Sequence, residues 1–390
     1  EEIQASINKL LKQKKYFKMK SDNQHISRVI ISGGGTGGHI FPAIAIANEI
    51  KARNPEAKIL FVGAIGKMEM TRVPDAGFDI VGLPIMGLQR KLTLSNLKLP
   101  FMLLISLFRA RKVVKKFNPE VVIGVGGYAS GPTLKMATWL GVPSVVQEQN
   151  SFPGKTNILL SKKVNLICTA YEGLEKFFPY EKIKLTGNPV RKNLSGGTIS
   201  KKEALNIFEL SENKKTILIL GGSLGAKTLN DTMLALTNEG ADTENQYIWQ
   251  CGKYYFDELK TKVSEKENSN IKLLAFISRM DAAYSAADII VSRAGALSVS
   301  ELCLVGKPVI LVPSPNVSED HQTKNAMSLV SDDAAILVRD VDCEDGLIKK
   351  VKTLLKDAEL SGRLSKNILS LARPNATSDI VNESENILLK

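Results

Sequence analysis

The sequence predicts an α/β protein made of two doubly wound domains, each with a parallel sheet, that face each other. Short apolar strands alternate with helical stretches along the chain, which is typical of a parallel sheet with helices on both faces. A strand, a glycine-rich turn and a helix open the pattern near residue 28, and the same series restarts near residue 216. The length of 390 residues suits two or three domains.

Each half is expected to contain several buried strands. In the first half a helix is predicted at 42–51, after the glycine-rich turn at 33–38, and strands are predicted at 28–32, 58–62, 121–125 and 143–146. In the second half a helix is predicted at 227–236, after the turn at 221–226, and strands are predicted at 216–220, 248–250, 271–274, 289–291 and 309–312.

These patterns divide the chain into four parts. Residues 1–25 form an extension, disordered or helical, without the apolar stretch of a secretory signal. Rossmann-like domains are expected at 26–190 and 191–375, with a linker near 188–200 where Pro and Gly cluster. A C-terminal helix is expected at 376–390, and the pattern leaves open which domain it packs on.

The positive charge is concentrated in two segments. The net charge is +12, and residues 80–119 carry eight Lys or Arg and no acid, while residues 1–20 carry six Lys and two Glu. A local basic cluster predicts an anionic partner. Lys and Arg interleaved with aromatic residues would indicate nucleic acid, and this pattern is absent from the sequence, so no nucleic-acid partner is expected.

An apolar segment lies between the basic residues, at 99–108. It is shorter than the roughly 20 residues that cross a bilayer. An apolar helix flanked by cations fits a helix that lies on an anionic membrane surface. Phe101, Leu104, Ile105 and Phe108 fall on one helical face, and core packing of this face is the alternative.

Two of the glycine-rich turns partly match nucleotide-binding motifs. The turn at 33–38 satisfies GxGxxG, but the next strand ends without an acid for a ribose, which disfavours a nicotinamide dinucleotide. The turn at 221–228 resembles a P-loop, but Ala226 replaces a glycine, which disfavours an NTPase. A third turn follows at 124–131. Tight turns without a ligand are the alternative, but three at strand ends favour a binding site.

Further polar clusters fall near strand ends, at 147–150, 187–191, 292–301 and 319–325. Small residues at 293–300 would let a helix N-terminus approach a pyrophosphate, and Glu301 could accept hydrogen bonds from ribose hydroxyls. Four cysteines lie far apart without a CxxC pair, and the chain has three histidines. We therefore expect no metal site, no cofactor and no disulfide framework.

Seven motifs, in order and spread over about residues 28–375, resemble those of glycosyltransferase family 28, the peptidoglycan N-acetylglucosaminyltransferases. The resemblance implies the GT-B fold, which consists of two Rossmann-like doubly wound parallel-sheet domains with an interdomain cleft. The motifs begin and end at Gly34 and Pro42, Gly126 and Pro132, Glu148 and Asn150, Gly187 and Arg191, Gly221 and Ala226, Arg293 and Glu301, and Asp320 and Ala326.

The resemblance implies an inverting transfer of GlcNAc. The donor would be UDP-GlcNAc, and the acceptor the 4-hydroxyl of MurNAc in undecaprenyl-pyrophosphoryl-MurNAc-pentapeptide (lipid I), giving lipid II for peptidoglycan. The first domain would hold lipid I and an anionic membrane surface, and the second would hold UDP-GlcNAc. The protein would be peripheral, at the cytoplasmic face of the plasma (inner) membrane, with other cell-wall and division proteins as further candidate partners.

The resemblance also implies roles for individual residues. Thr36, Gly37 and Gly38 would border the donor sugar or the acceptor diphosphate. The GlcNAc moiety would be bound by Asn150 and Gln322, the donor phosphates by Arg191 and Ser223, uracil by the backbone of Ile277, and the nucleotide by Ala296, Leu297, Ser298, Val299, Ser300 and Glu301, with Glu301 on the ribose.

His39 is the candidate general base, because it ends the first glycine-rich turn and imidazole titrates near neutral pH. The alternative is that His39 caps the helix or orients the acceptor. Glu148 is the reserve candidate. Some family members have His where this chain has Gln147, so we assign no catalysis there. Helix N-termini and Arg191 would stabilise the leaving UDP.

Two other functions stay open at this point. One is a GT-B transferase with a different acceptor, or a sugar-nucleotide epimerase. The other is a non-catalytic binding or scaffold protein, which the combination of His39, Arg191, Glu301 and Gln322 disfavours. His321 is expected to be structural or to contact the donor, and the cysteines to be inert core residues.

Overall fold

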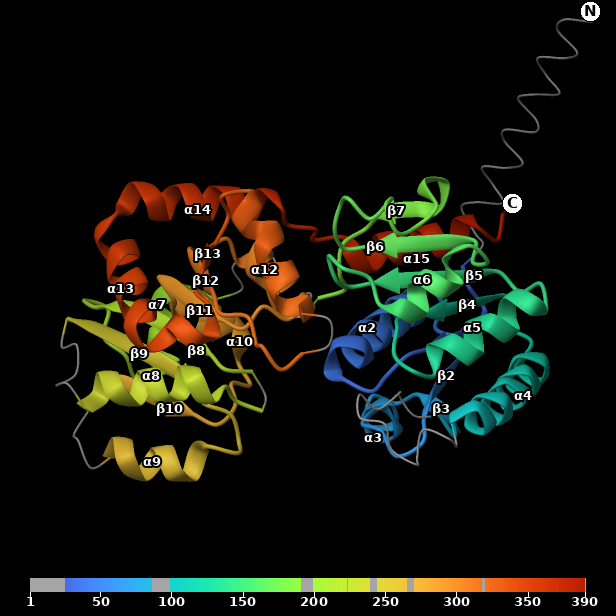
Figure 1. The fold of residues 1–390 in the computed structure, drawn as a ribbon, viewed down its shortest axis with the longest axis horizontal. Coiled ribbons are helices and arrows are strands. Elements are labelled where there is room, and N and C mark those ends of the chain that lie inside the picture. The colour runs from blue at the N-terminus through green and yellow to red at the C-terminus, as the bar shows by residue number, and fades with distance from the viewer. Residues whose placement is uncertain are drawn as a thin grey trace, which may run out of the picture. The chain divides into compact units, whose positions relative to one another are not determined.

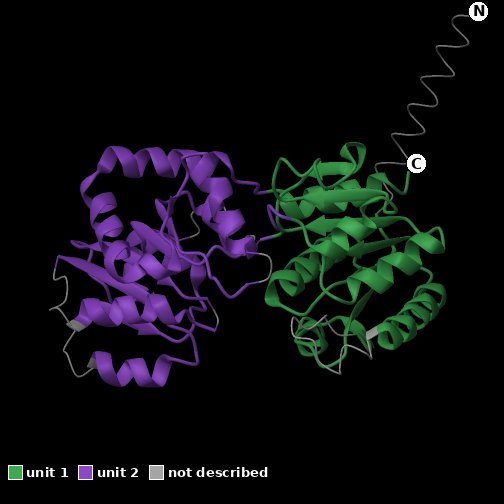
Figure 2. Ribbon diagram, in the orientation of Figure 1, with its two compact units in different colours: residues 1–149, 153–189, 375–390 green, residues 150–152, 190–374 purple. Residues whose placement is uncertain are grey.

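The computed structural model describes residues 25–85, 99–190, 199–222, 224–238, 244–264, 270–317 and 320–389. The chain forms two compact units (Figure 2). Unit 1 comprises residues 1–149, 153–189 and 375–390, and unit 2 comprises residues 150–152 and 190–374. Each unit is built around its own sheet, and all strand pairs in both sheets are parallel.

The sheet of unit 1 has the strand order β3-β2-β1-β4-β5-β6-β7. Its strands are β1 (Arg28–Ser32), β2 (Lys58–Ala64), β3 (Asp79–Leu83), β4 (Val121–Gly124), β5 (Ser144–Glu148), β6 (Leu166–Thr169) and β7 (Ile183–Leu185). Its helices are α2 (Gly37–Arg53), α3 (Glu69–Asp75), α4 (Leu99–Phe117), α5 (Ser130–Trp139), α6 (Lys155–Ser161) and α15 (Ala376–Asn386), with a 3₁₀ turn at η2 (Tyr180–Lys182).

Helices cover both faces of this sheet (Figure 1). Side chains alternate between the faces of a strand, so Val29 and Ile31 of β1 pack into one core with α2 and α15. Ile30 packs into a second core with α4 and α5. Two cores on one central strand make unit 1 doubly wound, as the sequence predicts.

The sheet of unit 2 has the strand order β10-β9-β8-β11-β12-β13. Its strands are β8 (Lys215–Leu220), β9 (Asn245–Gln250), β10 (Ile271–Leu274), β11 (Ile289–Ser292), β12 (Val309–Leu311) and β13 (Ile336–Leu337). Its helices are α7 (Lys201–Ile207), α8 (Lys227–Asn238), α9 (Phe256–Ser264), α10 (Met280–Ala286), α11 (Ala296–Val305), α12 (His321–Ser331), α13 (Cys343–Lys356) and α14 (Ala358–Ser370), with a 3₁₀ turn at η5 (Asp340–Asp342).

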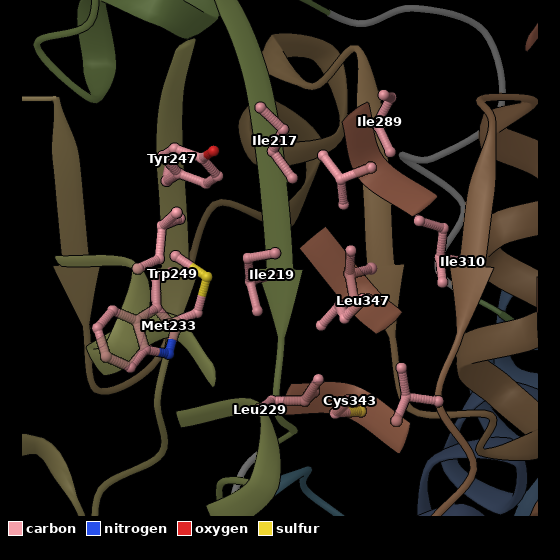
Figure 3. Close-up of a cluster of buried hydrophobic side chains, with 14 of the residues drawn as sticks. Ile217, Ile219, Leu229, Met233, Tyr247, Trp249, Ile289, Ile310, Cys343 and Leu347 are labelled. Carbon is pink, nitrogen blue, oxygen red and sulfur yellow. The ribbon is translucent and has the colours of Figure 1, made fainter. Parts of the chain in front are cut away.

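One face of the second sheet carries a large apolar core (Figure 3). Ile219 of β8 lies between Trp249 of β9 and Leu347 of α13, and all three side chains are fully buried. The Trp249 indole N–H donates to Asn230 Oδ1 on α8 at 3.0 Å. The core thus fixes α8, which begins after the second glycine-rich turn.

The last helix, α15, belongs to unit 1 and packs on α2. Ile380 and Val381 are buried in the core of that unit. The Arg53 guanidinium on α2 donates to Glu385 Oε2 at 2.8 Å, to Asn382 Oδ1 at 2.7 Å and to the Ser378 carbonyl oxygen at 3.0 Å. These bonds fix the C-terminal helix on the first of the two domains, a choice that the sequence pattern leaves open.

Several element bounds differ from the sequence prediction. Helix α2 begins at Gly37 rather than at Pro42, so Pro42 lies inside it and cannot donate to the Gly38 carbonyl. Strand β5 includes Gln147 and Glu148, which were expected to follow it. Strands β3, β6, β7 and β13 were not predicted.

Asp288 precedes β11 and holds three elements of unit 2 together. Its carboxylate accepts hydrogen bonds from Lys201 Nζ at 2.7 Å and from the Thr216 N–H at 2.9 Å. Burial raises the pKa of Asp288, but the bonds with Lys201 and Thr216 and the charges of Lys201 and Lys215 outweigh it, so the pKa is lowered overall.

Replacing Asp288 by Asn should therefore destabilise unit 2 in a pH-dependent way. A lowered folded-state pKa stabilises the fold above the usual carboxyl range, and this contribution is lost as the pH falls through the folded-state pKa. We expect Asp288→Asn to cost about 1–2 kcal/mol at pH 7 and less at pH 3. The measurement is urea unfolding in a Trp139→Phe background, in which Trp249 reports on unit 2.

Asp231→Asn is the matched control, because its ion pair with Lys227 is exposed and should be worth under about 1 kcal/mol. An equal penalty for Asp288→Asn at both pH values would contradict the prediction.

Candidate functional site

The turn after β1 lies directly against the turn after β4. A Cβ atom on Gly127 would overlap with the Gly34 carbonyl oxygen, and a Cβ atom on Gly33 would overlap with Val125. Gly34, at φ +148°, and Gly127, at φ +83°, also have backbone angles that other residues rarely adopt. The two turns can approach this closely only because glycine occupies these positions.

His39 follows the first turn as the third residue of α2. Its Nδ1 lies 3.1 Å from the Gly34 carbonyl oxygen and 3.3 Å from Thr36 Oγ1. A carbonyl oxygen only accepts hydrogen bonds, so Nδ1 carries the proton and Nε2 is the unprotonated nitrogen of the neutral ring. The geometry therefore makes Nε2 the nitrogen of His39 that can accept a proton.

The Nε2 side of the ring faces the turn after β4. A Cβ atom on Gly126, at φ +93°, would lie 2.9 Å from His39 Nε2. Thr36 and Gly38 are exposed beside His39, and Gly37 is half-buried. Unit 1 thus presents Thr36, Gly37, Gly38 and His39 together at the carboxyl edge of its sheet, where α/β sheets bind ligands.

Buried amide side chains support this edge of the sheet. Gln149 Nε2 donates to the Val125 carbonyl oxygen at 2.8 Å, and Asn188 Nδ2 donates to the Gln149 carbonyl oxygen at 3.0 Å. Gln147 Nε2 donates to Asn188 Oδ1 at 3.0 Å. These bonds fix the turn after β4 and give Gln147 a structural role.

Glu148, the reserve candidate for the base, is buried at the end of β5. Its Oε2 accepts from the Gly154 N–H at 3.0 Å and from Asn157 Nδ2 at 2.7 Å. Both partners belong to the start of α6. The geometry favours a role for Glu148 in shaping the loop after β5.

Asn150 belongs to unit 2 through its contacts with α12. Asn325 Nδ2 donates to Asn150 Oδ1 at 3.2 Å, and Asn325 Oδ1 accepts from the Ser151 N–H at 3.0 Å. The Lys324 ammonium lies 3.3 Å from the centre of the Phe152 ring. Asn325 thus orients Asn150, a role that the sequence did not assign. Its signals in the sequence were its places in the polar cluster at 319–325 and in the motif at 320–326.

The second glycine-rich turn, after β8, packs on the turn after β9. A Cβ atom on Gly225 would overlap with the Cys251 carbonyl oxygen, and Asn230 Nδ2 donates to that oxygen at 3.0 Å. Ser223 lies outside the described residues, and so does Arg191. Leu224 in the same turn is 82% exposed.

Helix α11 follows β11 and starts at Ala296. Ala296, Leu297, Ser298 and Ser300 are half-buried on its first turns, whereas Val299 is buried in the core. Only the backbone of Val299 can therefore border a ligand, as is expected for Ile277, whose side chain is also buried.

Three polar side chains of unit 2 have their orientation set by neighbours. Glu301 Oε2 accepts from the Tyr284 hydroxyl at 3.1 Å, and Gln322 Oε1 accepts from the Ser314 N–H at 2.9 Å. Arg293 pairs with Asp340 and donates to the Val312 carbonyl oxygen at 3.1 Å. Arg293 thus joins the start of α11 to β12 and η5, a role that the sequence did not indicate.

The four cysteines are buried. Burial raises the pKa of the Cys251 thiol to about 11 and that of Cys303 to about 12. The pKa values of Cys343 (to about 11) and Cys168 are also raised, mainly by burial. Thiols of this kind stay protonated at neutral pH. Within the described residues, no group of three or more His, Cys, Asp or Glu side chains is placed to hold a metal ion.

Two parallel α/β units with glycine-rich turns at the carboxyl ends of their strands are the architecture of GT-B glycosyltransferases. The glycosyltransferase family 28 N-terminal domain matches residues 29–169, and the glycosyltransferase family 28 C-terminal domain matches residues 216–378. The chain belongs to glycosyltransferase family 28.

Curated relatives cover nearly the whole chain. A protein of Flavobacterium psychrophilum is 56% identical over 91% of this chain and 96% of its own length. One of Parabacteroides distasonis is 53% identical over 93% and 99%. Both are named UDP-N-acetylglucosamine–N-acetylmuramyl-(pentapeptide) pyrophosphoryl-undecaprenol N-acetylglucosamine transferase.

Solved structures show the same fold. The crystal structure of Acinetobacter baumannii MurG is 30% identical, has a TM-score of 0.75, and is matched over 92% of this chain and 99% of that chain. UDP-GlcNAc 2-epimerase of Neisseria meningitidis, bound to UDP-GlcNAc, is 18% identical with a TM-score of 0.62, over 92% and 99% of the two chains. The epimerase match concerns the fold alone.

The packing of His39 against Gly126 can be tested by adding one methyl group. Gly126→Ala should displace the His39 ring, because the new Cβ atom would lie 2.8 Å from Cδ2 and 2.9 Å from Nε2. Gly141→Ala is the matched control, since Gly141 has φ +75° but no atom within 4 Å of a new Cβ atom.

Both variants should lose about 1–2 kcal/mol of stability through backbone strain. Only Gly126→Ala should change the NMR resonances of the His39 ring. Unchanged His39 resonances in Gly126→Ala would show that the ring does not contact this turn.

Proposed function

We propose that this protein transfers GlcNAc from UDP-GlcNAc to the 4-hydroxyl of MurNAc in undecaprenyl-pyrophosphoryl-MurNAc-pentapeptide (lipid I), giving lipid II. The observation that carries the proposal is the tautomer of His39, whose Nδ1–H is bound to the Gly34 carbonyl oxygen. It supplies a base for a hydroxyl acceptor, in a chain that is 56% identical to a transferase named for this donor and acceptor.

The reaction is one displacement with inversion. The acceptor O4 attacks the anomeric carbon of GlcNAc on the face opposite UDP. The O4–C1 bond forms while the bond from C1 to the UDP phosphate oxygen breaks, and UDP leaves with the electron pair. Nε2 of His39 takes the O4 proton, and the imidazolium that results keeps its Nδ1–H bond to Gly34.

Unit 2 holds the donor. The N-terminal turn of α11 offers its half-buried small residues and the positive end of the helix dipole to the diphosphate. Arg191 and Ser223 add contacts to the phosphates, and the backbone of Ile277 binds uracil. The Glu301 carboxylate, oriented by Tyr284, accepts hydrogen bonds from the ribose hydroxyls.

The GlcNAc moiety is bound by Asn150 and Gln322. Their side chains are oriented by Asn325 and by the backbone of Ser314, respectively. Amide groups both donate and accept, which suits the hydroxyl and acetamido groups of the sugar. An oriented amide discriminates between sugars more sharply than a freely rotating one.

Helix α4 of unit 1 contacts the membrane in which the lipid acceptor lies. The helix buries Ser106, Ala110 and Val114 and turns an apolar face outward. Phe101 is 73% exposed and Phe108 is 72% exposed, and Leu103, Leu104 and Ile105 are also exposed. The core-packing alternative for Phe101, Leu104, Ile105 and Phe108 is thus disfavoured.

Cations follow this apolar face on its C-terminal side. Arg109, Lys112, Lys115 and Lys116 are exposed on the same helix. Trp139 of α5, 65% exposed, lies under the Arg111 guanidinium at 5.2 Å. This combination suits an anionic membrane surface, and we place it at the cytoplasmic face of the inner membrane. No helix in the described part of the chain is long and apolar enough to cross a membrane.

The transfer is tested with radiolabelled UDP-GlcNAc and a short-chain lipid I analogue. Wild type should form labelled disaccharide lipid, and His39→Ala should lose at least about 100-fold in rate while UDP-GlcNAc binding, measured by calorimetry, is retained. His25→Ala is the control, because His25 is exposed and pairs with Glu385.

Folded wild type that binds UDP-GlcNAc but forms no product would overturn the acceptor assignment. A fully active His39→Ala variant would overturn the role of His39.

The membrane proposal is tested with phosphatidylglycerol vesicles. Phe101→Ser combined with Phe108→Ser should weaken sedimentation with vesicles at least about tenfold, because two large apolar side chains no longer enter the interface. Transfer to a water-soluble short-chain acceptor should be unchanged. Val341→Ser, at an exposed site of unit 2, is the control, and equal vesicle binding by both variants would contradict the proposal.

A further inference from the structure

Glu69 is a buried acid beneath the first glycine-rich turn. It is the first residue of α3 and is 1% exposed. Its Oε2 accepts from the Gly35 N–H at 2.8 Å, and its Oε1 accepts from the Ala64 N–H at 2.9 Å. A carboxylate removed from water needs such donors to be stable.

The surrounding backbone makes room for this carboxylate. A Cβ atom on Gly34 would overlap with the carboxyl group of Glu69, and a Cβ atom on Gly63 would lie 2.5 Å from Glu69 Cγ. Gly34 in the turn after β1 and Gly63 in β2 therefore enclose one side chain. The Glu69 side chain thus links α3 to the turn after β1 and to the end of β2.

Glu69 and His39 bind the same peptide group from opposite sides. The amide between residues 34 and 35 donates its N–H to Glu69 and accepts the His39 Nδ1–H at its carbonyl oxygen, at 3.1 Å. In a trans peptide these two bonds point in opposite directions. The arrangement is a carboxylate–histidine pair with one peptide group between its members.

We propose that Glu69 is a positioning residue that orients and tunes His39 through the 34–35 peptide group. The inference rests on the proposed function, in which His39 takes the acceptor proton. A carboxylate on the N–H polarises the peptide and strengthens its carbonyl as an acceptor. The stronger acceptor holds the proton on Nδ1, and the negative charge stabilises the imidazolium that forms during transfer.

The same contact bears on which ligand this turn can bind. Gly35 gives its N–H to Glu69, and the buried charge lies directly behind the turn. A phosphate at Gly35 would be repelled by this negative charge, whereas a neutral sugar hydroxyl would not be repelled. The first glycine-rich turn therefore suits the hydroxyl of the acceptor.

The other titratable groups on the elements around His39 have no hydrogen bond to the 34–35 peptide group among the bonds that the structure describes. Helix α2 has no acid in its first turn. On α3, Asp75 lies 3.7 Å from Arg72 at the exposed surface. Tyr128 is half-exposed after β4, and Glu148 is bound to Gly154 and Asn157. Of these groups, Glu69 is the one that shares a peptide group with His39.

The test is the titration of the His39 ring by NMR in wild type and Glu69→Gln. The chain has three histidines, so His39→Ala assigns the resonance. Loss of the negative charge should lower the His39 titration midpoint by about 0.5–1 pH unit. Asp75→Asn, which removes a charge from the same helix but has no bond to the turn, should leave the midpoint in place.

A kinetic readout separates tuning from a merely structural role. The acid limb of the pH profile of kcat/KM for the acceptor should shift in Glu69→Gln by the same amount as the NMR midpoint, with KM for UDP-GlcNAc unchanged. A variant that is less stable or less active at every pH, but keeps the wild-type midpoint and acid limb, would overturn the proposal.

Wild type offers a second test that needs no folded variant and no acceptor. The backbone ¹⁵N and ¹H resonances of Gly35 should titrate with the midpoint of the His39 ring, because both bind one peptide group. Gly35 resonances that do not change over the titration of His39 would overturn the proposal that Glu69 acts on His39 through the 34–35 peptide group. Both NMR readouts are independent of the acceptor. Failure of the transfer assay alone would therefore count against the proposed function and not against the coupling of Glu69 to His39.

Discussion

The candidate site depends on the backbone contact between the turns after β1 and β4. Gly34 and Gly127 touch without side chains between them, and this contact sets where the Gly34 carbonyl oxygen points. The His39 ring is bound to that oxygen and rests on Gly126. A side chain at Gly127 would push the two turns apart, and a side chain at Gly34 would displace Glu69. Either change would move the carbonyl oxygen that binds the His39 ring.

Unit 2 has the same strand–turn–helix element, but its glycine-rich turn packs on a different neighbouring strand end. In unit 1 the first strand and its contact partner, β1 and β4, flank the point where the strand order reverses. In unit 2 the turn after β8 packs on the turn after β9, on the other side of the central strand. Open α/β sheets bind ligands at the reversal point, here between β8 and β11. The proposed donor contacts on α11 start at this point.

The sequence predicted the central strands and the glycine-rich turns because both are local signals. β1, β4, β8 and β11 are apolar runs buried on two faces. The edge strands β7 and β13 have three and two residues and little burial, so neither length nor apolarity marks them. β3 contains Gly82 and is mostly half-buried, which weakens its pattern in the same way.

The hydrogen-bond partners of the site residues could not be predicted from the sequence, because they come from distant parts of the chain. Nothing in the spacing of residues links Glu69 to Gly35, Asn325 to Asn150, or Asp340 to Arg293, and only the fold brings each pair within hydrogen-bond distance. For α4 the pattern defined the apolar face but not its surroundings. Exposure of Phe101 and Phe108 argues against core packing of this face.

The two glycine-rich turns differ most in the charge placed next to them. The chain after β2 leads to Glu69, which puts a buried carboxylate behind the first turn. The corresponding chain after β9 leads to Gly252, which packs on Gly225 of the second turn, and then to Lys253, which is exposed. A negative charge strengthens a nearby imidazole as a base and repels phosphate, whereas a positive charge attracts phosphate. The charge that follows the second strand of each sheet thus agrees with the proposed roles, an acceptor hydroxyl at the first turn and the donor diphosphate at the second.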